Sequence, residues 1–248
     1  MAIKPNYEKI DGCEFYPADI MYEYKQCIDE GLDIEKYKEL FEAVSKLPHD
    51  EITHDLGDTI FKIVSGAPMR ADYEFNEPSE LEKIKALRKP YPVKGTVNRD
   101  TLRDKVHGAW LGRICGCMLG KTVEGIRSDE FIPFLKETGN YPLSRYIYRT
   151  DLMADIEDKY KFGFTGNMSY VGDIEGMPAD DDTNYMVLAQ IIREKYGKDF
   201  TPYSISIAWM DYQPKYAYCT AERVAFCNFV KGFTPPESAI YKNPYREW

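Results

Sequence analysis

Three consecutive aspartates, Asp180, Asp181 and Asp182, stand between a proline turn at Pro178 and an apolar helical pattern that begins at Tyr185. Successive residues of a regular helix point about 100° apart, so three adjacent side chains converge only where a loop meets a helix. A helix N-terminus stabilises one carboxylate but not three, and a divalent cation would neutralise the rest. Because carboxylate oxygens suit hard ions, the trio predicts a Mg²⁺, Ca²⁺ or Mn²⁺ site rather than a zinc site.

Two other interpretations of the trio stay open. In the first, Asp181 or Asp182 caps the following helix and the remaining carboxylates are solvated at the surface. In the second, the trio belongs to a structural Ca²⁺ loop, although the segment lacks the alternating Asp-x-Asp-x-Asp-Gly pattern of an EF-hand. The spacing alone does not choose among these interpretations.

A glycine stripe marks the element that precedes the trio. Glycine recurs at every fourth position of "RDTLRDKVHGAWLGRICGCMLGKTVEG", at Gly108, Gly112, Gly116 and Gly120. Each helical glycine costs roughly 1 kcal/mol relative to alanine, so the stripe needs a compensating packing or functional reason. Composition favours a tight helix–helix contact inside an all-helical core.

Helical periodicity also predicts the elements on either side. Residues 33–47 and 51–66 carry apolar stripes, and Ser79 with Glu82 predicts a capping box at the start of another helix. The linker "KPYPVKGTVN" ends this part of the chain, so we expect a helical accessory region over residues 1–98.

The second part of the chain predicts further helices. Residues 128–171 contain several breaks and predict a long excursion with short helices, and the pattern after Asp182 predicts a helix that stops at Gly197. Thr201 and Thr220 are expected to cap two later helices, the second ending at Gly232. Because strict alternation is nearly absent, the fold class is expected to be mainly α.

The composition limits the classes of function. The chain has 248 residues, 44% of them hydrophobic, and a net charge of −9, which argues against a phosphate-backbone binder and predicts no nucleic-acid partner. Its six cysteines form no paired CxxC metal motif, which favours reduced thiols in the cytosol. No apolar run approaches the roughly 20 residues that span a bilayer, so we expect a soluble cytoplasmic protein without a membrane partner.

Two stretches, "GAWLGRICGCMLGKTVEG" and "GMPADDDTNYMVL", together resemble the ADP-ribosylglycohydrolase family. Its members show a Gly-rich first helix that leads into a Gly-Lys-Pro-x-Glu-like turn, followed by an Asp-Asp-Thr motif that opens a helix. The tail "TAERVAFCNFVKGFTPPESAIYKNPYREW" is similar to a later segment of a larger-type branch of that family. Residues 99–248 are thus expected to be the front portion of such a domain.

The resemblance implies a compact all-helical fold, a Mg²⁺-dependent hydrolysis of an ADP-ribosyl or related N- or O-ribosyl linkage, and two Mg²⁺ ions that hold the ribose. The partner would be an ADP-ribose-type small molecule or an ADP-ribosylated substrate, and oligomer formation stays open. The implied metal ligands are Asp180, Asp181, Asp182 and Thr183. The implied catalytic residues are Glu124 and Asp181, and the implied substrate-binding residues are Gly120, Asn243 and Tyr245.

The chain departs from the family pattern at several of these positions. Asp180 stands where a threonine ligand is common, and Thr122 stands where proline is usual. Without the motif around it, Glu124 would be interpreted as a surface glutamate. Asn243 and Tyr245 equally fit a proline-flanked turn.

A larger departure is that no second motif of the form Asp-x-Asp-Thr lies between Thr183 and Trp248. The family completes its metal site with that motif, so its absence predicts one Mg²⁺ or none in this chain. It also predicts that these residues are the front portion of a longer protein or a truncated copy. The alternative to the hydrolase is a non-catalytic module that keeps half of the fold for ligand binding or assembly.

Overall fold

A computed structural model describes residues 5–92, 95–152, 154–160 and 169–247 of the chain. The structure is mainly helical, as the sequence predicts, and the described residues contain isolated β-bridges but no β-strand. No helix in this part of the chain is long and apolar enough to cross a membrane. The likeness of the fold to that of the ADP-ribosylglycohydrolases stays a prediction.

The chain forms two compact units, which are described separately. Unit 1 comprises residues 1–91 and 190–248, and unit 2 comprises residues 92–189. Residues 190–248 form one unit with residues 1–91, whereas the sequence predicts a boundary at residue 98; the predicted domain bounds stay a prediction. Ion pairs between residues far apart in the sequence, described below, join the two segments of unit 1.

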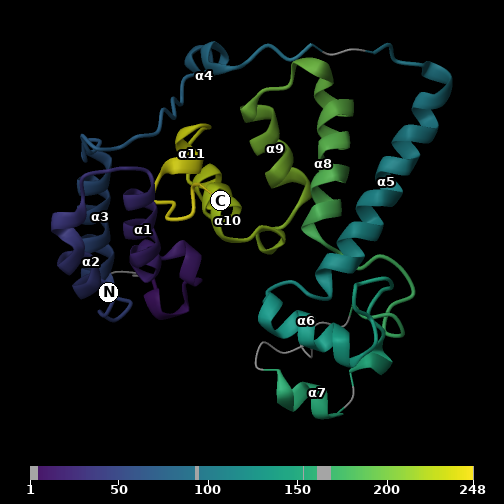
Figure 1. Ribbon diagram of the computed structural model, residues 1–248. Helices are drawn as coiled ribbons and strands as arrows, with labels where there is room; N and C mark the ends of the chain where they lie inside the picture. Colours follow the sequence, from purple (N-terminus) through teal and green to yellow (C-terminus); the bar gives the residue numbers. More distant parts are fainter. Residues whose placement is uncertain (1–4, 93–94, 153, 161–168, 248) are drawn as a thin grey trace. The chain divides into compact units, whose positions relative to one another are not determined.

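Unit 1 is built from short helices in both of its segments (Figure 1). The first segment contains η1 (Tyr7–Lys9), η2 (Gly12–Glu14), η3 (Tyr16–Asp19), α1 (Ile20–Asp29), η4 (Glu35–Tyr37), α2 (Lys38–Val44), α3 (Glu51–Ser65) and α4 (Leu81–Leu87). The second contains η6 (Gly197–Asp199), α9 (Pro202–Tyr212), η7 (Lys215–Ala217), α10 (Thr220–Val230) and α11 (Glu237–Ile240). The helix expected over residues 33–47 is present in a shorter form, as η4 followed by α2.

The core of unit 1 lies among α1, α2 and α3, which pack on one another. Ile20, Ile34, Phe41 and Ile60 are buried there. In the second segment, the Trp209 ring stacks on the buried Tyr218 with ring centroids 4.7 Å apart. The apolar stripes predicted from the sequence therefore face these interiors.

Unit 2 contains α5 (Arg99–Lys121), α6 (Ser128–Glu137), η5 (Arg149–Asp151), α7 (Ala154–Lys159) and the first part of α8 (Asp181–Tyr196). The short elements between α5 and α8 confirm the predicted excursion. Its small core is made of side chains from this excursion, namely Phe134, Leu135, Ile147, Ile156, Tyr160 and Tyr170. The long helix α5 leads directly to the turn that follows the glycine stripe.

The expected tight helix contact at the glycine stripe is wrong for the described part of unit 2. A Cβ atom added at Gly108, Gly112, Gly116 or Gly120 would meet no described atom within 4 Å. All four glycines are exposed. The stripe therefore leaves open space beside α5, and its last two glycines border the cavity described below.

Three expected helix ends had mixed outcomes. Thr201 caps α9, and its Oγ1 accepts a hydrogen bond from the Ser204 amide at 3.2 Å, as predicted. Gly232 follows α10 with φ +94° and confirms the predicted stop. Thr220 is the first residue of α10 and makes no cap, so that prediction is wrong, because the helix begins one residue earlier.

The capping box predicted at Ser79 is also wrong. Helix α4 begins at Leu81, which places Glu80 at the N-cap without a side-chain cap bond. The Glu82 carboxylate instead accepts a hydrogen bond from Lys85 at 2.8 Å. The Glu82 carboxylate, which a capping box would need, thus forms an ion pair with Lys85 one turn along the helix instead.

Candidate functional site

The predicted carboxylates meet at one cavity of about 300 Å³ in unit 2. The end of α5 contributes the first side chains, the turn after it contributes Glu124, and the start of α8 contributes the aspartates. The lining residues are Gly116, Cys117, Gly120, Lys121, Glu124, Asp180, Asp181 and Asp182. The structure thus brings together Gly120, Glu124 and the trio, as the motif order implies.

Asp180 caps α8. It immediately precedes the helix, and its Oδ1 accepts a hydrogen bond from the Asp182 amide at 3.0 Å. Its backbone carbonyl accepts from the Asn184 amide at 2.9 Å and from the Thr183 hydroxyl at 3.1 Å. The trio therefore lies at a loop-to-helix junction, as predicted, but the cap is Asp180 and not Asp181 or Asp182.

Lys121 forms an ion pair with Asp180 that the sequence interpretation did not include. Its Nζ lies 2.6 Å from the Asp180 Oδ2, and the two side chains are only 24% and 11% exposed. Burial raises the pKa of Asp180, but hydrogen bonds from Lys121, Cys117 and the Asp182 amide outweigh this and hold it below its usual value. The hydrogen bond to Asp180 raises the pKa of Lys121 in turn. The available signal was the lysine next to Gly120 in the glycine-rich motif.

Cys117 is the other group that sequence reasoning missed. It is buried one helical turn before Lys121, and its Sγ lies within 4.8 Å of carboxylate oxygens of Asp180 and Asp182. Burial, with the nearby Asp180, raises the pKa of the thiol to about 12. In the absence of a metal ion, Cys117 is therefore a protonated thiol at neutral pH that donates a hydrogen bond to Asp180.

The remaining predicted residues lie elsewhere or make other contacts. Thr183 follows the trio in α8 but is absent from the cavity lining. Asn243 is buried in unit 1, where its Nδ2 donates to the carbonyls of Ala221 and Ala239. Tyr245 is also buried there and hydrogen-bonds Asp19. The contacts of Asn243 and Tyr245 are those of a structural turn, and their predicted role in substrate binding stays a prediction.

The donor set at the cavity fits a hard divalent cation in part. Oxygens of Asp180 and Asp182 are close enough to share one ion, and the carboxylates of Asp181 and Glu124 are exposed at the same cavity. Asp180, however, already holds the Lys121 ammonium. A cation bound here would therefore share Asp180 with Lys121 or displace it.

Comparison with models of protein families, with curated proteins and with solved structures finds no match for this chain. The likeness to the ADP-ribosylglycohydrolases therefore rests on the two sequence motifs. What it implies about activity belongs to the proposal that follows.

Proposed function

We propose that the chain carries part of a Mg²⁺-dependent hydrolase site that cleaves an ADP-ribosyl or related ribosyl linkage. The supporting observation is that the two motifs carrying the resemblance line a single cavity. Lys121 and Asp180, which are 59 residues apart in the chain, are in direct contact there. Glu124 borders the same cavity as the trio.

Five of the eight lining residues have a role in this proposal. Asp180 and Asp182, with Asp181 beside them, would hold the ion, which when bound orients ribose hydroxyls and polarises water. Cleavage at the ribose C1 atom builds positive charge on the ring, and the Asp181 carboxylate would stabilise it. Glu124 would take the proton from the attacking water as the bond to the leaving group breaks. Gly120, which has no side chain, leaves room for the substrate.

A second candidate is a non-catalytic ligand-binding module, and the Lys121–Asp180 ion pair favours it. An ammonium group there does part of what a metal ion would do, because it neutralises the most buried carboxylate of the trio. In this module the cavity would bind a ribosyl ligand through the remaining carboxylates without cleaving it.

Titration calorimetry with Mg²⁺ tests the metal assignment. We expect the whole chain to bind Mg²⁺ and Asp182→Asn to lose at least tenfold in affinity. Asp129→Asn, which removes an exposed carboxylate of unit 2 outside the cavity, serves as the matched control and should bind as the parent does. Equal titrations of the parent and Asp182→Asn would overturn the metal assignment.

Release of ADP-ribose from ADP-ribosylated peptides then separates the two candidates. The hydrolase proposal expects release that requires Mg²⁺ and is lost in Glu124→Gln while Mg²⁺ binding persists. Ligand binding without release, in a chain that binds Mg²⁺, would support the module instead.

A further inference from the structure

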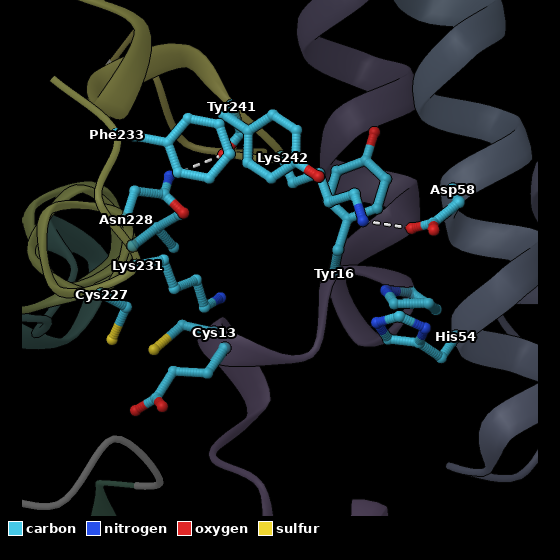
Figure 2. Close-up of a pocket in the computed structure, with 13 residues that line it drawn as sticks. Cys13, Tyr16, His54, Asp58, Cys227, Asn228, Lys231, Phe233, Tyr241 and Lys242 are labelled. Carbon is cyan, nitrogen blue, oxygen red and sulfur yellow. Dashed lines mark hydrogen bonds and ion pairs between the residues drawn. The ribbon is translucent and has the colours of Figure 1, made fainter. Parts of the chain in front are cut away.

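Unit 1 contains a second cavity, of about 320 Å³, whose residues take no part in the proposed function. Its walls come from four parts of the unit: the η2–η3 region, α3, the C-terminal end of α10 and the segments that flank α11 (Figure 2). Such a volume lies at the lower end of the range for small-molecule sites. This volume restricts the ligand to a small molecule. The chemistry of the lining then determines which kind of small molecule fits.

Most of the charges around this cavity are already paired. The Asp58 carboxylate forms an ion pair with Lys242, and the Glu14 carboxylate lies 2.6 Å from the Lys215 ammonium. Burial, with a hydrogen bond to Asp11, raises the pKa of Cys13 to about 12, and burial also raises the pKa of Cys227. Both thiols are therefore neutral near pH 7 and balance no cation.

Lys231 carries a positive charge at this cavity, and neither of these carboxylates pairs with it. Its ammonium extends into the open space of the cavity (Figure 2). No ion pair to it is present among the residues that the structure describes. The cavity thus offers one positive charge to a ligand.

Asn228 supplies a fixed acceptor on the same wall as this charge. The residue is only 2% exposed, and its Nδ2 donates to the carbonyls of Ser238 and Tyr241, each at 2.8 Å. Because carbonyls can only accept, the amide cannot be flipped, and its Oδ1 faces the cavity (Figure 2). No described donor reaches this oxygen. The oxygen borders the open space of the cavity, so a ligand donor placed there would gain a hydrogen bond.

An aromatic wall completes the cavity. The rings of Phe233 and Tyr241 stack with their centroids 4.3 Å apart and an interplanar angle of 21°. Both residues line the cavity beside Asn228. They offer apolar surface to the carbon skeleton of a ligand.

We propose that this cavity binds a small molecule that carries one phosphate or carboxylate group and a hydroxyl donor. The anionic group binds the Lys231 ammonium, the hydroxyl donates to Asn228 Oδ1, and the carbon skeleton lies against Phe233 and Tyr241. The site is independent of the carboxylate cavity of unit 2, because the two share no residue.

Calorimetry on the whole chain tests the site with two probes of matched size, glycerol 3-phosphate and glycerate. We expect one of them to bind, which also distinguishes phosphate from carboxylate, and to bind more tightly than inorganic phosphate or glycerol. Lys231→Met should lower its affinity at least tenfold. Lys62→Met, which removes an exposed lysine of α3 outside the cavity, should leave the affinity unchanged.

The donor is tested through the ligand, because replacing Asn228 would also remove two internal hydrogen bonds. Propyl phosphate and propionate keep the charge but lack the hydroxyl groups, and each should bind about tenfold more weakly than its hydroxylated counterpart. The proposal is overturned if neither hydroxylated probe binds at millimolar concentration. It is equally overturned if Lys231→Met or the loss of the hydroxyls leaves the affinity unchanged.

Discussion

The two cavities differ in how their charge arises. In unit 2, four carboxylates face a cavity whose lining includes a single lysine, and three of the carboxylates are adjacent in the sequence. In unit 1, the cavity borders paired acids and bases from distant segments and keeps one ammonium in excess. The net charge of −9 describes neither cavity. The sign of a site depends on which counter-charges the fold places beside it.

Two ion pairs, one from each unit, also differ in burial. In unit 1, Arg246 bonds Glu23 and Glu30, and the Glu23 side chain is fully buried. In unit 2, the Lys121–Asp180 pair lies at the wall of a cavity and keeps part of its exposure. We infer that the first arrangement stabilises the fold and that the second modulates a site.

Removing Arg246 should have the largest effect. The Arg246→Met variant leaves the buried Glu23 carboxylate without its ion-pair partner, and such losses cost about 3–5 kcal/mol. Urea unfolding of the whole chain measures the change. Arg246→Lys keeps the charge and should recover part of the loss. A loss below about 1 kcal/mol in Arg246→Met would mean that this pair does not hold the segments of unit 1 together.

The ion pair between Arg145 and Asp151 tests whether an ion pair of unit 2 also stabilises the fold. The Asp151 carboxylate accepts hydrogen bonds from Arg145 at 2.6 and 2.8 Å and from the Tyr148 amide at 2.8 Å. Burial raises the pKa of Asp151, but these bonds outweigh it and leave the pKa below its usual value. We expect Asp151→Asn to lose about 2 kcal/mol near pH 7.

The lowered pKa of Asp151 also predicts how the loss of stability in Asp151→Asn changes with pH. A carboxyl group with a lowered pKa stabilises the fold above its unfolded pKa of about 3.9, and the contribution disappears as the pH falls through the folded pKa. The difference between parent and Asp151→Asn should therefore shrink below about pH 4 in urea unfolding. A difference that stays constant down to pH values of about 2 would assign the loss to packing instead.

Lys121 bears on the carboxylate cavity itself. Removing its charge in Lys121→Met leaves Asp180 free for a cation, so Mg²⁺ should bind about tenfold more tightly, a change of roughly 1.4 kcal/mol. Calorimetry measures the affinity, and Lys105→Met, an exposed lysine of α5 outside the cavity, is the control. Weaker binding in Lys121→Met would show that Lys121 orders the site and does not compete for it.

The smallest effect concerns two threonines that look alike in the sequence. Thr201→Ala removes the cap of α9 and should cost about 1 kcal/mol, whereas Thr220→Ala removes no cap bond and should cost clearly less. Thermal unfolding of both variants checks the difference. Equal losses would mean that Thr220 stabilises α10 in another way.

Local patterns in the sequence were sufficient to predict the helical class, the helices α3 and α9, and the loop-to-helix junction at which the three aspartates lie. Periodicity and capping act over a few residues, so the sequence of a short segment already contains them. The same reasoning failed at Ser79 and Thr220, where two neighbouring positions could serve as the helix start. A shift of one residue is enough to lose a cap.

The tertiary structure alone determined the partners of the charged groups. Nothing in the sequence near Asp180 predicts that Lys121 neutralises it, and nothing near Asn228 predicts that its amide oxygen faces a cavity. These contacts join residues that are separated in the chain, so they depend on how separate segments pack. The sequence by itself determined where negative charge is concentrated. The fold determined how much of that charge remains available to a ligand, because counter-ion placement and burial depend on long-range packing.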